Sequence, residues 1–300
     1  MSTIAALILN YHQKNRTLRF LQQLIEAEPG LGPIFLVDNS CPQEFSANDV
    51  ELLGLPTEVL GTGTNLGVAG GRNLGISVAL KSIRKWDHLA MLDNDLIVPP
   101  GSLAALARAL QSIPRAGIAG PCVVDADDSS VVLAAGGEIL PFFYPRYHRA
   151  KPQGSRRSLE EPRATTFVQG GVTLYTRALL ETGLRFDQRF NPYGPEDIDF
   201  CLAAAAAGFT IVLAPSVTIG HEGRGTYKTT FRHQRQLATG EILLRLKWAP
   251  HPYPSVLAYL AWKVFRAVVY AKWQEKWKAM LGAVAGAGNA VRLWRQSGNA

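Results

Sequence analysis

The chain is poor in cysteine and lacks an apolar run long enough to cross a membrane. Its three cysteines, Cys41, Cys122 and Cys201, lie far apart, a spacing that fits reduced thiols and argues against a disulfide scaffold or a thiolate zinc site. Lys263 and Arg266 interrupt the most aromatic stretch, which is too short to span a bilayer. The apolar run at 4–9 follows no basic segment or cleavage site. We therefore expect no signal peptide and a cytoplasmic location.

No nucleic-acid-binding motif accompanies the positive charge. The formal net charge is +7, and the basic residues gather toward the C-terminal part of the chain. This distribution indicates anionic ligands or an anionic membrane surface, and we expect no nucleic-acid partner. A hydrophobic content of 47% in 300 residues supplies the core of a large α/β domain.

Short apolar runs alternate with helical patterns along the chain. The expected strands are 4–9, 34–37, 58–60, 89–92, 116–124, 167–175, 210–213 and 217–221. Helical spacing appears at 17–27, from Asn73 to about Lys85, and from Glu196 onward. The alternation predicts a Rossmann-like, doubly wound and mostly parallel sheet with helices on both faces. Ligands of such sheets bind beyond the carboxyl ends of the strands.

The strand expected at 89–92 ends in two acidic residues separated by one position. Asp93 and Asp95 repel each other and lose hydration at a buried strand end, and a divalent cation relieves both costs. The pattern predicts a metal-dependent site for a phosphorylated ligand. Asp38 ends another strand, and parallel strands bring both acidic groups to one edge of the sheet.

A second acidic group opens the alanine-rich helix. Glu196, Asp197 and Asp199 lie within four residues at its expected start, where carboxylates also favour the helix dipole. One of them can act as a general base near a bound hydroxyl. His221, at a later strand end, is open to two interpretations: a satisfied polar residue, or a third metal ligand that suits manganese.

The glycine-rich segment does not match the common nucleotide-binding motifs. Leu66 stands at the third glycine position of the dinucleotide fingerprint, and no Gly-Lys-Ser/Thr is present, so neither a nicotinamide enzyme nor an ATPase is favoured. A sugar nucleotidyltransferase would carry a basic, glycine-rich loop where this chain has residues 9–12. Taken alone, residues 65–75 read as a turn that feeds a helix.

Several of these motifs occur together in a fixed order. They are Asp38-Asn39-Ser40, Asn65 to Gly75, Asp93-Asn94-Asp95, Glu196 to Asp199, and His221. In this order they resemble family 2 glycosyltransferases of the GT-A fold, in particular the rhamnosyltransferase-like branch, over roughly residues 4–227. The joint pattern is much more specific than any single motif.

The resemblance implies an inverting transfer from a nucleotide-diphosphate sugar to a hydroxyl of a glycan or lipid-linked acceptor in cell-surface polysaccharide synthesis. The donor would be a dTDP- or UDP-sugar, with dTDP-rhamnose the first to test, and the cofactor Mn2+ or Mg2+. The implied donor nucleotide-binding residues are Asn10, Asp38, Asn65, Gly67, Arg72, Asn73 and Asp93. The implied metal ligands are Asp93, Asp95 and His221. The implied base is Asp197, with Glu196 supporting it or binding the acceptor, and Gly170 and Gly171 lie beside the sugar or acceptor.

One departure from the family pattern keeps an alternative open. The family commonly has an arginine where Ala203 stands, seven residues after Glu196. In this chain the positive charge of that arginine is either lost or supplied by another residue, with Arg224 and Arg177 as candidates. The alternative function is a nucleotide-sugar-binding protein that has lost transfer.

We expect a GT-A catalytic domain at 1–230 and a C-terminal helical extension at 231–300. Aromatic residues follow one side of a helix expected over Pro254 to Lys278: Tyr259, Trp262, Val269, Tyr270, Trp273 and Trp277. This face suits a peripheral helix at the inner face of the plasma membrane. The same helix could instead pack on the catalytic domain or on a second subunit, and in the second case the protein would be a homo-oligomer. The stretch 282–300 is expected to be loosely helical or less ordered.

Overall fold

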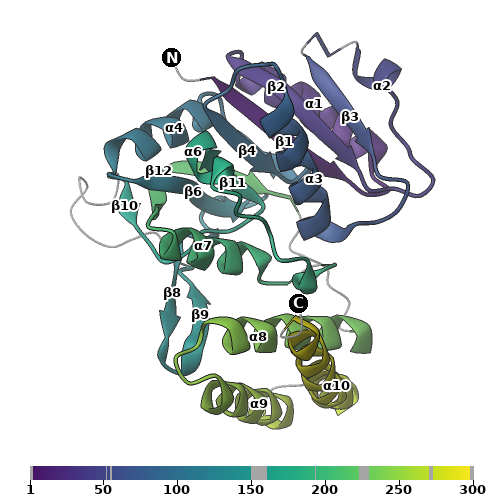
Figure 1. Cartoon of the computed structure of the whole chain (residues 1–300), viewed down its shortest axis with the longest axis vertical. Coiled ribbons are helices and arrows are strands. Elements are labelled where there is room, and N and C mark those ends of the chain that lie inside the picture. Colours follow the sequence, from purple (N-terminus) through teal and green to yellow (C-terminus); the bar gives the residue numbers. More distant parts are fainter. Residues whose placement is uncertain are drawn as a thin grey trace.

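The computed structural model describes residues 3–51, 53–54, 56–149, 161–192, 194–222, 230–269 and 273–297. An α/β body with a large central sheet lies above a layer of three helices (Figure 1). The strands are β1 (Ile4–Asn10), β2 (Leu31–Asp38), β3 (Thr57–Gly61), β4 (His88–Leu92), β5 (Leu96–Ile97), β6 (Ala116–Asp125), β7 (Val132–Ala134), β8 (Gly137–Leu140), β9 (Tyr144–Tyr147), β10 (Arg163–Ala164), β11 (Val172–Thr176) and β12 (Thr210–His221). The helices are α1 (Lys14–Ala27), α2 (Ala47–Glu51), α3 (Gly67–Lys81), α4 (Ser102–Ser112), α6 (Arg177–Glu181), α7 (Glu196–Ala206), α8 (Phe231–Trp248), α9 (Pro252–Val269) and α10 (Trp273–Ser297), with short 3-10 turns η1 (Pro141–Phe143) and η2 (Gln188–Phe190).

The central sheet is mostly parallel, as the alternation of strands and helices predicts. Its main path runs β10-β12-β6-β11-β4-β1-β2-β3. Strands β1 to β4 are parallel, and β11 lies antiparallel between β4 and β6. Val172, the first residue of β11, therefore pairs with Leu92, the last residue of β4. The start of β11 and the ends of β1, β2 and β4 share one edge.

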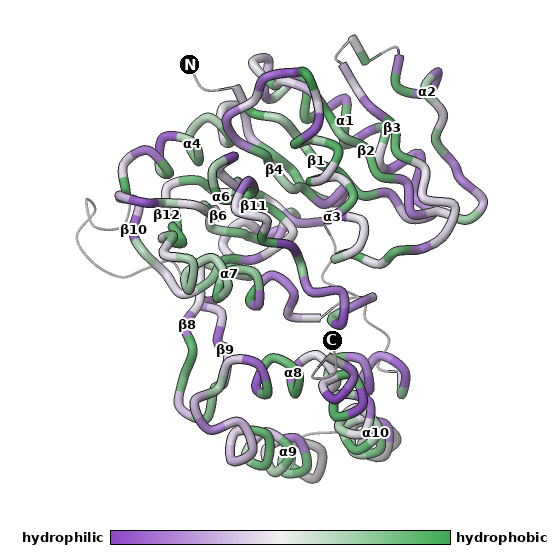
Figure 2. Tube along the Cα trace, in the orientation of Figure 1, coloured by the Kyte–Doolittle hydropathy of each residue, from purple (hydrophilic) through white to green (hydrophobic). Residues whose placement is uncertain are grey.

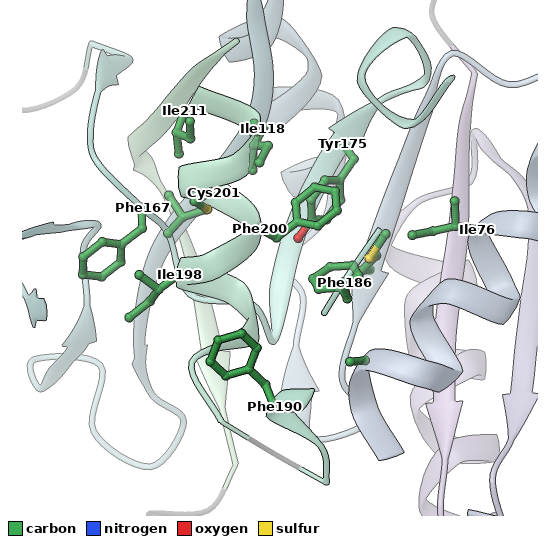
Figure 3. Packing of buried hydrophobic residues seen from close by; sticks show 14 of the residues in the cluster. Ile76, Ile118, Phe167, Tyr175, Phe186, Phe190, Ile198, Phe200, Cys201 and Ile211 are labelled. Carbon is green, nitrogen blue, oxygen red and sulfur yellow. The ribbon is translucent and has the colours of Figure 1, made fainter. Parts of the chain in front are cut away.

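Apolar side chains fill both faces of this sheet. Strand residues alternate between two clusters, so that Leu7 belongs to one and Ile8 to the other. The strands β1, β2 and β4 are largely hydrophobic along their length (Figure 2), as expected for strands covered on both faces. In the cluster of Figure 3, Phe200 of α7 stacks on Phe186 with ring centroids 4.4 Å apart. This packing holds α7 so that its acidic first turn lies near the edge of the sheet.

The helix α3 begins earlier than the sequence indicated. We expected a start at Asn73 and an end near Lys85, but the helix runs from Gly67 to Lys81. A Cβ added to Gly75 would lie 2.2 Å from Cδ1 of Leu7, so the glycine lets the helix approach β1 closely. Close packing outweighs the low helix propensity of glycine here, which is why the expectation of a turn over 65–75 was wrong beyond Leu66.

Two strand predictions also need correction. The expected strands at 210–213 and 217–221 are one strand, β12, with an irregularity between Ala214 and Thr218. The strand expected at 167–175 begins only at Val172, because Gly170 and Gly171 precede the pairing with β4.

The C-terminal segment differs from the single aromatic helix that we expected. Helix α9 ends at Val269 and α10 begins at Trp273, and residues 270–272, including Tyr270, lie outside the described residues. Tyr259, on the expected aromatic side of the helix, is buried with the guanidinium carbon of Arg245 4.4 Å from its ring centroid, so at this residue the side packs on the rest of the chain. No helix in the described parts of the chain combines the length and apolarity that a bilayer crossing requires.

The stretch expected to be loosely helical is a regular part of α10. It continues to Ser297 and packs on α8. A Cβ on Gly286 would lie 2.6 Å from the Cβ of Ala238, so small residues allow close contact of the two helices. The helix α10 is thus held by packing on the rest of the chain.

Candidate functional site

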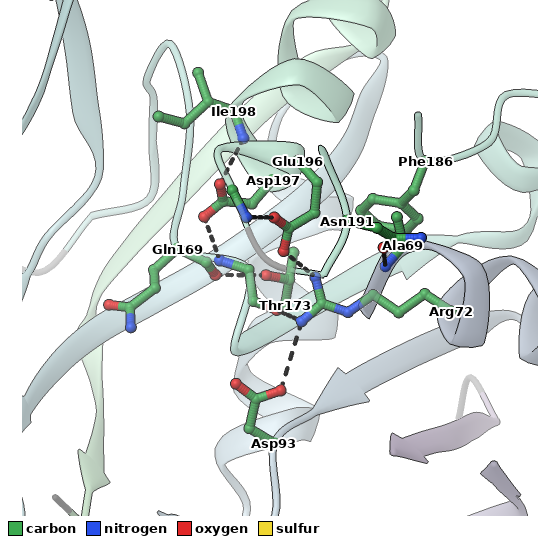
Figure 4. Close-up of polar contacts among 12 residues, drawn as sticks. Ala69, Arg72, Asp93, Gln169, Thr173, Phe186, Asn191, Glu196, Asp197 and Ile198 are labelled. Carbon is green, nitrogen blue, oxygen red and sulfur yellow. Dashed lines mark hydrogen bonds and ion pairs between the residues drawn. The ribbon is translucent and has the colours of Figure 1, made fainter. Parts of the chain in front are cut away.

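Polar side chains meet where β4 ends and β11 begins (Figure 4). The backbone N–H of Asp93 donates to the carbonyl of Gly171 at 2.8 Å. A Cβ on Gly171 would lie 2.7 Å from Oδ2 of Asp93, and one on Gly170 would lie 2.6 Å from Cβ of Asp197. The paired glycines therefore leave room for two carboxylates on either side of the β11 start.

Arg72 of α3 lies between these acids and is buried. Its Nη2 donates to the carbonyl of Gly170 at 2.9 Å and lies 3.5 Å from Oδ1 of Asp93, while Nη1 lies 3.4 Å from Oε1 of Glu196. Burial alone lowers the pKa of this guanidinium, but the negative charges of Asp93 and Glu196 raise it overall. The side chain therefore stays charged and offsets part of the acidic charge.

The first turn of α7 carries two carboxyl groups in different surroundings. Burial raises the pKa of Glu196, and the adjacent Asp197 adds to the rise while Arg72 opposes it. Asp197 is only half-buried, and its Oδ2 accepts hydrogen bonds from Tyr147 Oη at 2.8 Å and Gly170 N at 2.9 Å. Its Oδ1 accepts from Ile198 N at 2.8 Å. A carboxylate held this way and reachable from solvent can accept a proton.

Asp95 and His221 form a pair beside this group. Strand β5 pairs with β12 so that Leu96 lies opposite His221, which brings the preceding Asp95 to 3.5 Å between its Oδ1 and the Nε2 of His221. Asp95 Oδ1 and His221 Nδ1 are buried without a hydrogen-bond partner among the described residues. Unsatisfied buried polar atoms are costly in a protein interior, so this pair fits the ligands of a cation.

Asp93 does not complete a metal cluster with this pair. Within the described residues, no three His, Cys, Asp or Glu side chains converge on a position for a metal ion. Burial raises the pKa of Asp93, and its carboxylate lies next to Arg72. The structure thus brings two of the three predicted ligands together, and one or two carboxylates with phosphate oxygens and water are typical of a magnesium site on a nucleotide.

A cavity of about 530 Å³ opens at the same edge of the sheet. Its lining residues are Leu9, Tyr11, Gln13, Asn39, Asn65, Gly67, Val68, Asn94, Pro192, Arg232 and Gln236. Of the predicted nucleotide-binding residues, Asn65 and Gly67 lie in this wall. Arg232 and Gln236 belong to α8, inside the segment expected as a separate extension, so no local motif could have identified them.

Asn10, Asp38 and Asn73 do not line this cavity. Asn10 Nδ2 donates to Oδ1 of Asp38 at 2.9 Å, and both residues are fully buried. Burial raises the pKa of Asp38, but hydrogen bonds from Asn10 and Ser40 outweigh it and lower the pKa overall. Asn73 exchanges two hydrogen bonds of 2.8 Å with the backbone of Phe186. These contacts hold loops in place, and a direct contact with a nucleotide stays a prediction for all three.

The acidic motif obtains a cation from α8. Lys247 Nζ lies 2.8 Å from Oδ1 of Asp199, and Trp248 Nε1 donates to the same oxygen at 2.7 Å. Arg177, one candidate to replace the arginine absent at Ala203, does not serve this role because it pairs with Glu181 on α6, after the far end of β11. Arg224, the other candidate, lies outside the described residues.

Both a family model and curated relatives that match this sequence are glycosyltransferases. The model of the family described as Glycosyltransferase like family 2 matches residues 2–239. N-acetylglucosaminyl-diphospho-decaprenol L-rhamnosyltransferase from two strains of Mycobacterium tuberculosis is 28% identical over 218 residues. The match covers 68% of this chain and 70% of that relative.

Solved structures share the fold. GalNAc-T7 with UDP, GalNAc and Mn2+ superposes with a TM-score of 0.65 at 15% identity, covering 91% of this chain. This chain spans about half of that protein, 52% of its length. The mannosyltransferase PcManGT from Pyrobaculum calidifontis, in complex with GDP-Man and Mn2+, gives a TM-score of 0.56 at 15% identity and covers 96% of this chain and 86% of that one. At such identities the likeness establishes the GT-A fold alone.

Proposed function

Because the chain belongs to glycosyltransferase-like family 2, we propose that it transfers a sugar from a nucleotide-diphosphate donor to a hydroxyl acceptor with inversion at the anomeric carbon. The observation that carries this proposal is the unsatisfied Asp95–His221 pair, in which Asp95 directly follows Asn94 in the wall of a cavity of about 530 Å³. The half-buried carboxylate of Asp197 lies at the same edge of the sheet. This arrangement supports a divalent cation and diphosphate on one side and a base on the other.

The donor would occupy the cavity with its diphosphate toward Asp95 and His221. Bound Mn2+ or Mg2+ would supply positive charge that stabilises the departing diphosphate. Among the described residues of the cavity wall, Arg232 alone is charged, and its cation suits the same ligand. Asn65 and Gly67 would lie along the nucleotide, and Gly170 and Gly171 beside the sugar.

Asp197 would accept the proton of the acceptor hydroxyl. The acceptor oxygen attacks the anomeric carbon while the bond from that carbon to the diphosphate oxygen breaks, so one proton must leave the hydroxyl. A cation held by Asp95 and His221 would neutralise the charge of the departing diphosphate, so no catalytic acid would be needed. Glu196 would support the base or bind the acceptor, and the raised pKa from its burial favours the neutral form more than for an exposed glutamate.

The relative from Mycobacterium tuberculosis suggests the substrates to test. Its name specifies transfer of L-rhamnose to an acceptor linked to decaprenol diphosphate. We infer a dTDP- or UDP-sugar as donor, dTDP-rhamnose first, and a lipid-linked glycan acceptor in cell-surface polysaccharide synthesis. A lipid-linked acceptor would place the protein at the inner face of the plasma membrane.

The exposed side of α9 supports such a location. Tyr253 and Leu257 are 74% and 67% exposed, Val264 follows on the same side of the helix, and the exposed Phe265 borders that side. Apolar and aromatic side chains in this arrangement suit a peripheral contact with a bilayer. Replacing Leu257 and Phe265 with serine should reduce sedimentation with vesicles containing anionic lipid, and unchanged sedimentation would contradict a membrane role for α9.

Two variants test the division of roles in the site. Asp95→Ala should abolish the Mn2+-dependent part of nucleoside diphosphate binding, whereas Asp197→Asn should bind normally and lose turnover. Calorimetry measures the first property and transfer from a nucleotide sugar the second. Glu26→Ala, on the exposed side of α1, serves as the control. Equal loss of donor affinity in both site variants would contradict the proposal.

The alternative is a nucleotide-sugar-binding protein without transfer activity. The absence of an arginine at position 203 motivates it. Lys247 weakens this argument because it gives Asp199 a cation from another helix. Such a protein would bind the donor with the metal and neither transfer nor hydrolyse it, so product formation decides between the two functions.

A further inference from the structure

The hairpin of β8 and β9 connects the active-site region with the C-terminal helices (Figure 1). Its tip, the η1 turn, contacts α9. At its other end, Tyr147 is the last residue of β9, and its ring meets Phe167 edge on, with centroids 4.9 Å apart.

The hydroxyl of Tyr147 reaches the first turn of α7. Its Oη donates to Oδ2 of Asp197 at 2.8 Å. Burial raises the pKa of Tyr147 well above its ordinary value, and the charge of Asp197 adds to the rise. The hydroxyl therefore keeps its proton and acts as a donor to the carboxylate.

The two oxygens of Asp197 are bonded unequally. Oδ2 accepts from both Tyr147 Oη and Gly170 N. Oδ1 accepts only from Ile198 N among the hydrogen bonds between described residues. A carboxylate oxygen has two lone-pair sites, so Oδ1 keeps capacity for one more hydrogen while Oδ2 is filled.

We propose that Tyr147 is a positioning residue for transfer, which with Gly170 N holds Oδ2 of Asp197 so that Oδ1 receives the proton of the acceptor hydroxyl. This inference rests on the proposed function. In the step, the acceptor oxygen bonds to the anomeric carbon and the bond from that carbon to the diphosphate oxygen breaks. The bonding electron pair leaves with the nucleoside diphosphate, and the hydroxyl proton moves to Oδ1.

The contact also gives the C-terminal helices an indirect role in catalysis. The hairpin that carries Tyr147 is supported at its tip by α9, where Phe143 is partly buried against the same apolar cluster as Leu260. A shift of α9 would therefore move the hydroxyl relative to Asp197. No substrate contact by α9 is required for this effect.

The variant Tyr147→Phe tests the inference while keeping the ring on Phe167. Loss of a hydrogen bond to a charged group predicts a fall in kcat of about tenfold. The donor KM and the Mn2+-dependent affinity for the nucleoside diphosphate should stay unchanged, because the hydroxyl contacts none of the proposed donor site. The matched control is Tyr144→Phe on the same strand, where the side chain is exposed.

A double variant separates positioning from a general structural effect. In an Asp197→Asn background, adding Tyr147→Phe should not lower the residual rate further, because the hydroxyl would act through the carboxylate. Three results would overturn the inference: full activity of Tyr147→Phe, a loss of donor affinity as large as its loss of kcat, or additive losses in the double variant. If the wild-type protein transfers sugar, the proposed function stands in each of these cases. A folded wild-type protein that transfers no sugar would overturn both.

Discussion

Two aspartates at strand ends on the same edge of the sheet have opposite surroundings. Asp38, at the end of β2, accepts hydrogen bonds from Asn10 and Ser40 on Oδ1 and from the backbone of Glu44 and Phe45 on Oδ2. Asp95, just beyond β4, has a buried Oδ1 that faces His221 at 3.5 Å and has no hydrogen-bond partner among the described residues. Both were expected to contact the donor or its metal.

This difference in hydrogen bonding distinguishes a carboxylate that stabilises the fold from one that is free to bind a ligand. A buried polar atom without a partner lowers stability, so it persists where binding compensates for it. A fully bonded carboxylate has no capacity for a ligand unless its loop rearranges. By this criterion we propose Asp95 as the ligand residue, whereas the hydrogen bonds of Asp38 hold the loop at residues 38–45 and its contact with the nucleotide stays a prediction.

The largest expected effect is on metal-dependent binding when Asp95, the carboxylate without a hydrogen-bond partner on Oδ1, is replaced. We expect Asp95→Asn to weaken Mn2+-dependent binding of a nucleoside diphosphate by at least about 100-fold, because the cation loses a charged ligand. The melting temperature should not fall, since no hydrogen bond to Asp95 Oδ1 is lost. Calorimetry and thermal unfolding measure the two quantities, and a large fall in stability with intact metal binding would reverse the assignment.

The opposite pattern is expected for Asp38→Ala. The variant leaves several buried donors unpaired, so the free energy of unfolding should fall by about 3 kcal/mol. Urea denaturation measures the change, with Glu51→Ala at the exposed end of helix α2 as a control for loss of a carboxylate. Unchanged stability together with lost nucleotide binding would show that Asp38 contacts the donor directly.

Asp199 is a second bonded carboxylate and extends the comparison to the C-terminal helices. Burial raises its pKa, and the charge of Lys247 opposes the rise. Removing that cation in Lys247→Met should lower the free energy of unfolding by about 2 to 3 kcal/mol, whereas Lys247→Arg should retain most of it. Equal stability of the two variants by urea denaturation would contradict a structural role for the contact between α7 and α8.

The smallest effect concerns acid stability at Asp187, which also pairs with Lys247. Burial raises the pKa of Asp187, but hydrogen bonds from Arg189 and the charge of Lys247 lower it from 3.8 to about 2. The folded pKa is below the unfolded value, so about 2 kcal/mol of stability is present above the unfolded pKa and lost as pH falls through the folded one. In Asp187→Asn, the free energy of unfolding should depend less on pH between the folded and unfolded pKa values of Asp187. An unchanged slope of unfolding free energy against pH would contradict this linkage.

The sequence predicted the sheet and its acidic edge because these depend on local patterns. The runs that became β1, β2 and β4 are continuous apolar segments, and Asp38, Asp93 and Asp95 follow from where they end. The early start of α3 could not be predicted, since it depends on close contact of Gly71 with Leu9 and Asn39, which lie outside the helix. Tertiary packing there overrides helix propensity.

The parts of the site that escaped prediction come from distant segments. Tyr147 reaches Asp197 from a hairpin, and Lys247 reaches Asp199 from α8, contacts that no short motif records. Arg232 lines the cavity from the same helix. The boundary expected at residue 230 stays a prediction, but α8 contributes directly to the cavity and to the support of α7.

The central claim is that Asp95 and His221 bind a cation that holds a nucleoside diphosphate in the adjacent cavity. The most direct test is calorimetric titration of the wild-type protein with UDP, dTDP, GDP and ADP, each with and without Mn2+. We predict metal-dependent binding of a pyrimidine diphosphate that Asp95→Asn abolishes. Failure of the folded protein to bind any of the four, or binding of equal strength without the metal, would contradict the claim.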